Sequence, residues 1–127
     1  MTELVAVAKA FADPNRIRII SALRNGELCV CELSDALGVT QSTLSTHLQV
    51  IREAELVQTR KQGKWVYYRI KPEAEQLIDS IFGSFARELK ADETLRRDAK
   101  GLTARLKERQ DGECCVGFCR PKSRTKA

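Results

Sequence analysis

The sequence predicts a mostly helical fold with one β-hairpin, and three observations lead to this fold class. Apolar residues recur at helical spacing through most of the first half of the chain and again after Pro72. Between these regions, the segment LVQTRKQGKWVYYRI alternates and is rich in Val, Tyr and Trp, which is typical of paired strands. A length of 127 residues is that of one compact domain.

The first three helices have recognisable start and stop signals. Residues 2–12 show helical spacing, Asp13 suits an N-cap, and Pro14 suits the first position of a second helix. Gly26 ends that helix, and the following ELCV is expected to be a short extended piece. CELSDALG then predicts a third, short helix that ends at Gly38.

A fourth helix begins after Thr40, whose hydroxyl suits an N-cap. Leu44, Leu48 and Ile51 form its apolar stripe. The opposite face is polar without being strongly charged, which is unusual for a helix face that only meets solvent. The members of this polar face are Gln41, Ser42, Ser45, Thr46 and Gln49.

The second half of the chain begins with the hairpin, whose turn is predicted at Gln62-Gly63. Pro72 then opens a long apolar helix that runs through residues 73–89. A more polar helix follows over residues 92–110.

Two short helices joined by the tight turn LGVT and followed by a basic hairpin describe a winged helix-turn-helix. Its second helix enters the major groove of DNA, where small amide and hydroxyl side chains reach base edges and phosphates. Residues 41–71 carry six basic and two acidic side chains, which also favours a nucleic-acid partner, although a protein-interaction module has the same pattern. The predicted DNA-contacting residues are Gln41, Ser42, Thr43, Ser45 and Thr46 on the helix and Arg60, Lys61, Gln62 and Lys64 on the hairpin.

His47 is grouped with these residues, and it has three possible roles. It follows Leu44 by three residues and precedes Leu48, so it borders the apolar stripe. It either contacts a phosphate or base, or packs as a half-buried structural histidine. Metal ligation is the third role, but the chain has no second histidine to assist it.

Residues 13–70 resemble the ArsR/SmtB family of metal-responsive bacterial repressors. The matching motifs follow in order: D-P-x-R, E-L-C-V-C-E-L, Q-S-T-L-S-x-H-L and G-K-x-V-Y-Y-R. The second motif in particular resembles the arsenic-responsive branch and some cadmium/lead sensors. The resemblance implies a homodimer that represses resistance operons by binding double-stranded operator DNA and leaves the DNA when metal binds.

A homodimer is also expected from the surplus of large apolar residues. Residues 73–89 and 3–12 carry more of them than one winged helix needs, and a two-fold interface would bury the excess, although a single monomer core is the alternative. The polar helix over 92–110 is expected to pack near that interface. We therefore expect residues 1–110 to form a DNA-binding and dimerisation domain, and residues 111–127 to form a flexible, basic, cysteine-containing tail.

The five cysteines form two clusters. Trivalent arsenic and antimony are soft and take three thiolates. Arsenic-responsive relatives with the motif C-V-C-D-L-C carry three thiols near the first helix of the motif, but here Ser34 stands where the third would be, so Cys29 and Cys31 do not close a three-sulfur site alone. The tail supplies three thiols, and the predicted site for arsenite, As(III), or Sb(III) is Cys114, Cys115 and Cys119.

Three alternatives remain for these cysteines. A cadmium/lead-type sensor would combine Cys29 and Cys31 with tail cysteines, and a redox-sensing repressor would use a disulfide. Cys29 and Cys31 are also small enough to be buried hydrophobes. Zinc or nickel sensing through the last helices is not expected, because residues 73–110 contain no histidine.

The composition predicts a cytoplasmic protein with no membrane span, because no apolar run approaches about 18 residues and the N-terminus lacks the pattern of a signal peptide. An enzyme is not expected. Cys29-Val30-Cys31 is not the C-x-x-C motif of thioredoxin-like enzymes, and the chain has no glycine-rich phosphate-binding loop.

Overall fold

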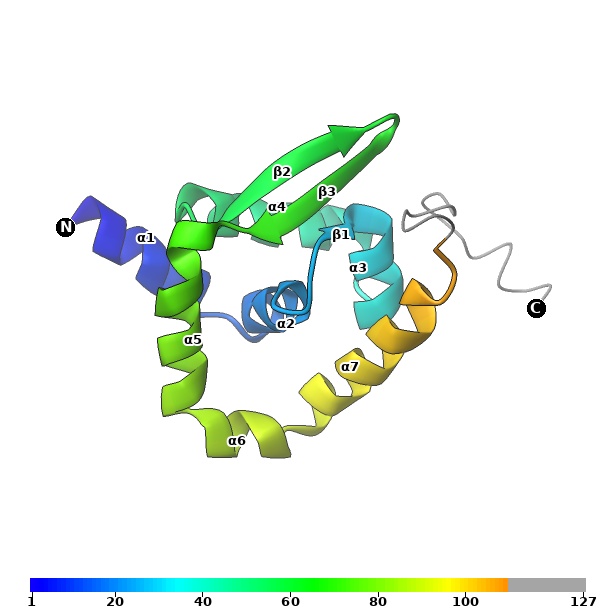
Figure 1. Cartoon of the computed structure of the whole chain (residues 1–127). Helices are drawn as coiled ribbons and strands as arrows, with labels where there is room; N and C mark the ends of the chain where they lie inside the picture. Colours follow the sequence, from blue (N-terminus) through cyan, green and yellow to red (C-terminus); the bar gives the residue numbers. More distant parts are fainter. Residues whose placement is uncertain (110–127) are drawn as a thin grey trace.

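A computed structural model describes residues 1–109, and it shows a helical domain with a projecting hairpin (Figure 1). The predicted tail over residues 111–127 lies outside the described residues. The elements in chain order are α1 (Thr2–Ala10), α2 (Pro14–Leu23), β1 (Leu28–Cys29), α3 (Val30–Leu37), α4 (Gln41–Glu53), β2 (Val57–Gln62), β3 (Trp65–Ile70), the short 3₁₀ helix η1 (Pro72–Ala74), α5 (Glu75–Ser84), α6 (Ala86–Ala91) and α7 (Glu93–Leu106).

The caps predicted at Asp13, Gly38 and Thr40 are confirmed, while α1 ends at Ala10 rather than residue 12 and α3 begins at Val30, one residue earlier than predicted. The Asp13 carboxylate accepts hydrogen bonds from the backbone N–H groups of Asn15 and Arg16, at 2.8 and 3.4 Å. The Thr40 hydroxyl accepts one from the N–H of Thr43 at the start of α4. Gly38 ends α3 in the left-handed conformation, with φ 67°.

The apolar stripe of α4 lies in the core, as predicted. Leu44, Leu48 and Ile51 are buried together with Leu33 of α3 and Ile20 of α2. The polar face of α4 is therefore turned away from the rest of the domain.

The hairpin is confirmed, but its turn lies one residue later than predicted. The sheet order is β1-β3-β2, with antiparallel pairing throughout, and Gln62 pairs with Trp65. The two turn residues are therefore Gly63 and Lys64. Gly63 has φ 60°, a conformation that glycine adopts without a steric penalty.

The single long helix predicted over residues 73–89 is wrong. The chain forms η1, α5 and α6, and Phe85 (φ −114°, ψ 25°) separates α5 from α6. Gly83 and Ser84 precede this break, and Gly/Ser pairs are common at sharp helix kinks. Figure 1 shows α6 running across the end of α5.

The polar helix α7 packs mainly against α3 and α2 of its own subunit, and it also contacts α6. Its expected position near a dimer interface formed by residues 3–12 and 73–89 stays a prediction. The helices α5, α6 and α7 form an arc around α2 (Figure 1). Within residues 1–109, no helix has the length and apolar composition needed to cross a bilayer.

Candidate DNA interface and thiol site

The polar face of α4 begins at the helix N-terminus. Ser42, Thr43, Ser45 and Thr46 are exposed, and Gln41 is half-buried. The Thr46 hydroxyl donates to the carbonyl oxygen of Ser42 at 3.1 Å, and the Thr40 hydroxyl donates to that of Thr43, also at 3.1 Å. The first two turns therefore present small hydrogen-bonding groups beside the positive end of the helix dipole, which suits a phosphate-lined groove.

The turn between α3 and α4 is closed by Ser34. Its hydroxyl donates to the carbonyl oxygen of Val39 at 2.6 Å, and its own carbonyl oxygen accepts from the N–H groups of Gly38 and Val39. Ser34, which stands where the arsenic-responsive motif has its third cysteine, thus stabilises the turn by hydrogen bonds. These bonds close the turn between α3 and α4.

The wing, which is the hairpin of β2 and β3, presents its basic side chains in two ways. Lys61 and Lys64 are exposed, with the Lys64 ammonium 5.2 Å from the centre of the Trp65 ring. Arg60 instead turns back to Glu27, its guanidinium 2.8 Å from the carboxylate, and also bonds Gln62. The hydrogen bond from Arg60 is the main reason why the pKa of Glu27 lies below its ordinary value.

His47 lies at the junction of three helices. Its side chain is 14% exposed, with Nδ1 3.2 Å from Nη1 of Arg16 and Nε2 3.9 Å from the Asp13 carboxylate. Arg16 also donates to the carbonyl oxygen of Lys9 at 2.7 and 3.0 Å. The structure thus places His47 in a network between α1, α2 and α4, and a contact with DNA stays a prediction.

Cys29 and Cys31 lie together in the interior. Their side chains are 1% and 2% exposed, and their Sγ atoms are 2.8 Å apart. Cys29 is the N-cap of α3 in a capping box: its sulfur accepts from the N–H of Glu32, and its own N–H donates to Oε1 of Glu32 at 3.0 Å. Tyr67 is buried against both cysteines.

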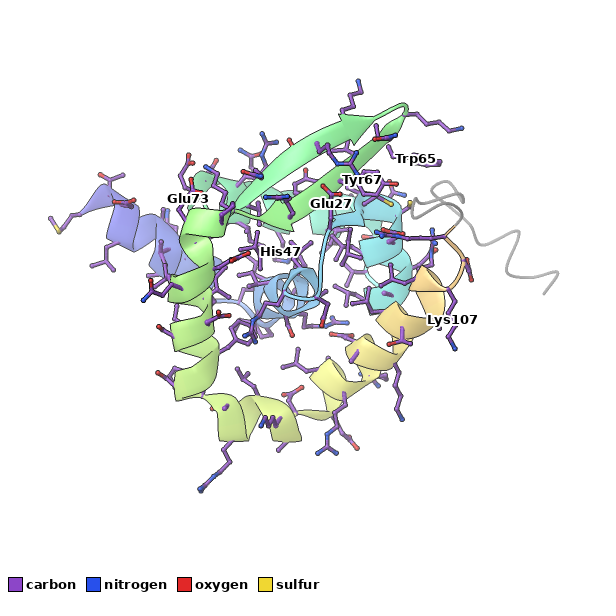
Figure 2. All side chains as sticks on the ribbon, in the orientation of Figure 1. Glu27, His47, Trp65, Tyr67, Glu73 and Lys107 are labelled. Carbon is purple, nitrogen blue, oxygen red and sulfur yellow. The ribbon has the colours of Figure 1, made fainter. Side chains whose placement is uncertain are left out.

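Two arginines from the far end of the chain reach this site. Arg105 donates to the Asp35 carboxylate at 2.8 Å and to Sγ of Cys31 at 3.8 Å. Arg109 donates to Glu32 at 2.6 and 2.8 Å and to the carbonyl oxygen of Glu27 at 2.7 Å. Figure 2 shows Glu27 and Tyr67 where the sheet meets the start of α3, with Lys107 marking the end of α7.

Glu32 is fully buried, and burial alone would raise its pKa. The bonds from Arg109 and from the N–H of Cys29, with the charges of Arg109 and Arg105, outweigh burial and hold the pKa below its ordinary value. Glu32, Arg105 and Arg109 are not among the site residues predicted from the sequence. The spacing held a partial signal: Glu32 and Asp35 lie three residues apart on α3, and Arg105 of α7 precedes Arg109, just after the helix, by four residues.

Cys29 and Cys31 supply two sulfurs of the three that a trivalent metalloid takes. Residues 1–109 contain no group of three or more His, Cys, Asp or Glu side chains arranged to hold a metal ion. Cys114, Cys115 and Cys119 lie outside the described residues. Residues 1–109 therefore supply two of the three thiolates that such a site requires, and a third ligand would have to come from elsewhere.

Large apolar side chains remain exposed on α1 and near α5. Leu4 is 70% exposed, Val5 49%, Leu77 42% and Phe85 56%. These residues lie in the two segments, 3–12 and 73–89, in which the sequence shows more large apolar residues than one subunit needs. Ile78 and Phe82, from the same surplus, are buried in the core of the subunit.

Comparison with known proteins supports the interpretation of these features. Residues 13–59 match the model of the bacterial regulatory proteins of the arsR family. The chain is 46% identical over 76 residues to the arsenic resistance transcriptional regulator ArsR1 of Pseudomonas putida, with 59% of each chain covered. It is 44% identical over 83 residues to the arsenical resistance operon repressor of Escherichia coli K12, with 61% of this chain and 71% of that protein covered.

A solved structure has the same architecture. A homodimeric winged helix-turn-helix DNA-binding domain from Mycobacterium bovis, described as a possible ArsR-family regulator, superposes with a TM-score of 0.64. The identity is 28%, over 72% of this chain and 85% of that one. Together with the motifs of α3, α4 and the wing, these matches show that the chain is a winged helix-turn-helix protein and belongs to the arsR family of bacterial regulatory proteins.

Proposed function

We propose that this protein is a transcriptional repressor that binds double-stranded operator DNA as a homodimer and is released when arsenite, As(III), or Sb(III) binds its cysteine thiolates. The observation that carries the DNA-binding part is the exposed polar face at the N-terminus of α4, with its apolar stripe buried behind it. The names of its relatives in Pseudomonas putida and Escherichia coli support arsenic as the effector.

The predicted DNA contacts follow from this proposal. Gln41, Ser42, Thr43, Ser45 and Thr46 read base edges and phosphates from the groove, and Lys61 and Lys64 contact the backbone from the wing. Arg60 and Gln62 also contact the DNA backbone, either after the ion pair between Arg60 and Glu27 opens or while Arg60 bonds Glu27 and a phosphate together. His47 acts at the edge of this surface, through Arg16 and Asp13 or by its own contact with a phosphate.

The homodimer is supported by the apolar surface on α1 and α5. Leu4, Val5, Leu77 and Phe85 are costly to leave in water, and a second copy would bury them. A two-fold pair of subunits places two copies of α4 in successive major grooves, about 34 Å apart.

The metalloid ligands are proposed to be Cys114, Cys115 and Cys119, which provide three thiols within one short segment. A second ligand set combines Cys29 and Cys31 with tail cysteines. Two observations favour keeping it: the two sulfurs lie only 2.8 Å apart, and Arg109, which bonds to Glu32 beside them, precedes Cys114 by five residues.

A pair of variants separates the two ligand sets. In one protein Cys114, Cys115 and Cys119 are replaced by Ser, and in the other Cys29 and Cys31 are replaced by Ser. Each is titrated with arsenite under reducing conditions in a gel-shift assay, with cadmium, lead and zinc as comparison metals. The tail set predicts that only the first protein stays on the operator. Retention of both proteins indicates the mixed site, and oxidant-driven release without metal indicates redox control.

A further inference from the structure

Within residues 1–109, three ion pairs connect α7 and Arg109, which follows it, to the first half of the domain. Arg109 pairs with Glu32 at 2.6 Å, Arg105 with Asp35 at 2.8 Å, and Asp98 with Arg18 of α2 at 2.8 Å. Two of the partners lie on α3, and the order of the pairs shows that α3 and α7 run antiparallel. We call this set of contacts the α7 brace.

Each of the three pairs contains one buried charged side chain. Glu32 is 0% exposed, Arg105 4% and Asp98 7%. A buried charge that loses its partner is costly, so the three pairs together favour one position of α7 against α2 and α3. Leu102, also buried, favours the same position from the apolar side.

The two helices also approach each other closely. A Cβ atom added at Gly101 would lie 2.6 Å from the carbonyl oxygen of Ala36 in α3, which is closer than atoms pack. The brace therefore depends on a glycine in the middle of α7, where an alanine would otherwise favour the helix.

The brace reaches both ends of α3. At the C-terminal end, Arg18 bonds Asp98 and also donates to the carbonyl oxygen of Leu37 at 2.6 Å, immediately before the turn that leads into α4. At the N-terminal end, Arg109 bonds Glu32 and the carbonyl oxygen of Glu27. Both ends of α3, the helix before α4, are thus linked to the brace: the C-terminal end through Arg18 and Asp98, and the N-terminal end through Arg109.

We propose that the α7 brace sets operator affinity from the side away from the DNA, and that Arg105 and Arg109 are positioning residues for α4. This inference rests on the proposed DNA binding. Release of the brace leaves α3 held by its capping and turn hydrogen bonds and by its apolar contacts, with Leu33 and Leu37 still buried. The fraction of protein with α4 in the binding orientation then falls, and the measured affinity falls by the same factor.

The test compares Arg109→Gln with Arg97→Gln in the full chain. Both changes remove one positive charge, but Arg97 is exposed on α7 while Arg109 holds Glu32. Hydrogen exchange over residues 93–106 reports opening of the brace. Operator affinity is measured at several salt concentrations and corrected for the active fraction, so that partial unfolding is not mistaken for weak binding.

The brace predicts that Arg109→Gln speeds exchange in α7 and weakens operator binding by about 3- to 10-fold, with the salt dependence unchanged. Arg97→Gln should change neither exchange nor affinity by more than about 2-fold. Faster exchange with unchanged affinity overturns the inference alone. A drop of about one in the salt slope also overturns it, because Arg109 would then contact a phosphate. Failure of the unaltered protein to bind any operator DNA defeats the proposed function and the inference together.

Glu32→Gln supplies an independent check. Glutamine still accepts the hydrogen bond from the N–H of Cys29 but cannot form the ion pair with Arg109. If the pair acts as proposed, a protein with both Glu32→Gln and Arg109→Gln binds the operator no more weakly than the protein with Arg109→Gln alone. Strictly multiplicative losses would show that the two residues act separately, and the brace would be rejected.

Discussion

At the scale of single residues, we predict that side chains at the start of α4 contact base edges and that those further along the helix contribute less to operator binding. Gln41 lies in the first turn, where groove-reading helices contact base edges. Gln41→Ala should weaken operator binding by about 1–3 kcal/mol and relax sequence preference. Gln49→Ala, nearer the end of the same helix, is the matched control and should cost less. Equal affinities for both variants and the unaltered protein would remove Gln41 from the interface.

The wing lysines should act differently. Lys64→Ala should weaken binding to operator and unrelated DNA alike and lower the slope of affinity against salt by about one. A loss confined to the operator would mean that Lys64 reads sequence, which its place in the hairpin turn does not predict.

Glu32 makes stability depend on pH. Its pKa lies below the ordinary value in the folded protein, because burial, which raises it, is outweighed by hydrogen bonds, chiefly the one from Arg109. Its stabilising contribution is therefore present above the unfolded pKa and is lost as the pH falls through the folded pKa. Urea unfolding between about pH 7 and pH 3 should show falling stability at the acidic end. Glu32→Gln should be less stable at neutral pH and show a shallower fall. A curve parallel to that of the unaltered protein would contradict this assignment.

At the scale of secondary-structure elements, the α3–α4 turn depends on Ser34. Ser34→Ala leaves the carbonyl oxygen of Val39 without its 2.6 Å hydrogen bond and should lower the free energy of unfolding by about 1 kcal/mol. Ser80→Ala, at an exposed position of α5, is the control and should change it by less than about 0.5 kcal/mol. Matching midpoints in urea for the two variants would show that the turn does not need this bond.

Elements defined by local chemistry were predictable, and elements defined by distant contacts were not. Asp13, Thr40 and Gly38 act within a few residues, so sequence alone places the helix ends that they cap. The break at Phe85 and the docking of α7 depend on neighbours that the sequence does not reveal. Arg109 and Glu32 are 77 positions apart, and their pairing follows only once the topology is known. The exposure of the polar face of α4 was predictable, because its residues alternate at helical spacing with the buried stripe of Leu44, Leu48 and Ile51.

At the scale of the whole molecule, the exposed apolar residues of α1 and α5 predict a dimer. Phe85→Glu places a charge on this surface and should raise the dimer dissociation constant by at least about 10-fold, as measured by analytical ultracentrifugation. Val66→Glu changes an exposed apolar residue of the wing and is the control. Identical sedimentation of both variants as dimers would place the interface elsewhere.

We propose that metalloid and operator bind to alternative states of one dimer. The direct measurement is operator affinity with and without arsenite under reducing conditions, combined with the mass of the protein in both samples. Coupling of about 1–3 kcal/mol predicts that arsenite weakens operator binding by roughly 5- to 150-fold, and that DNA weakens arsenite binding by the same factor. Both samples should contain dimers. Operator affinity that does not respond to arsenite would contradict the claim, and a metalloid-induced monomer would show that release occurs by dissociation.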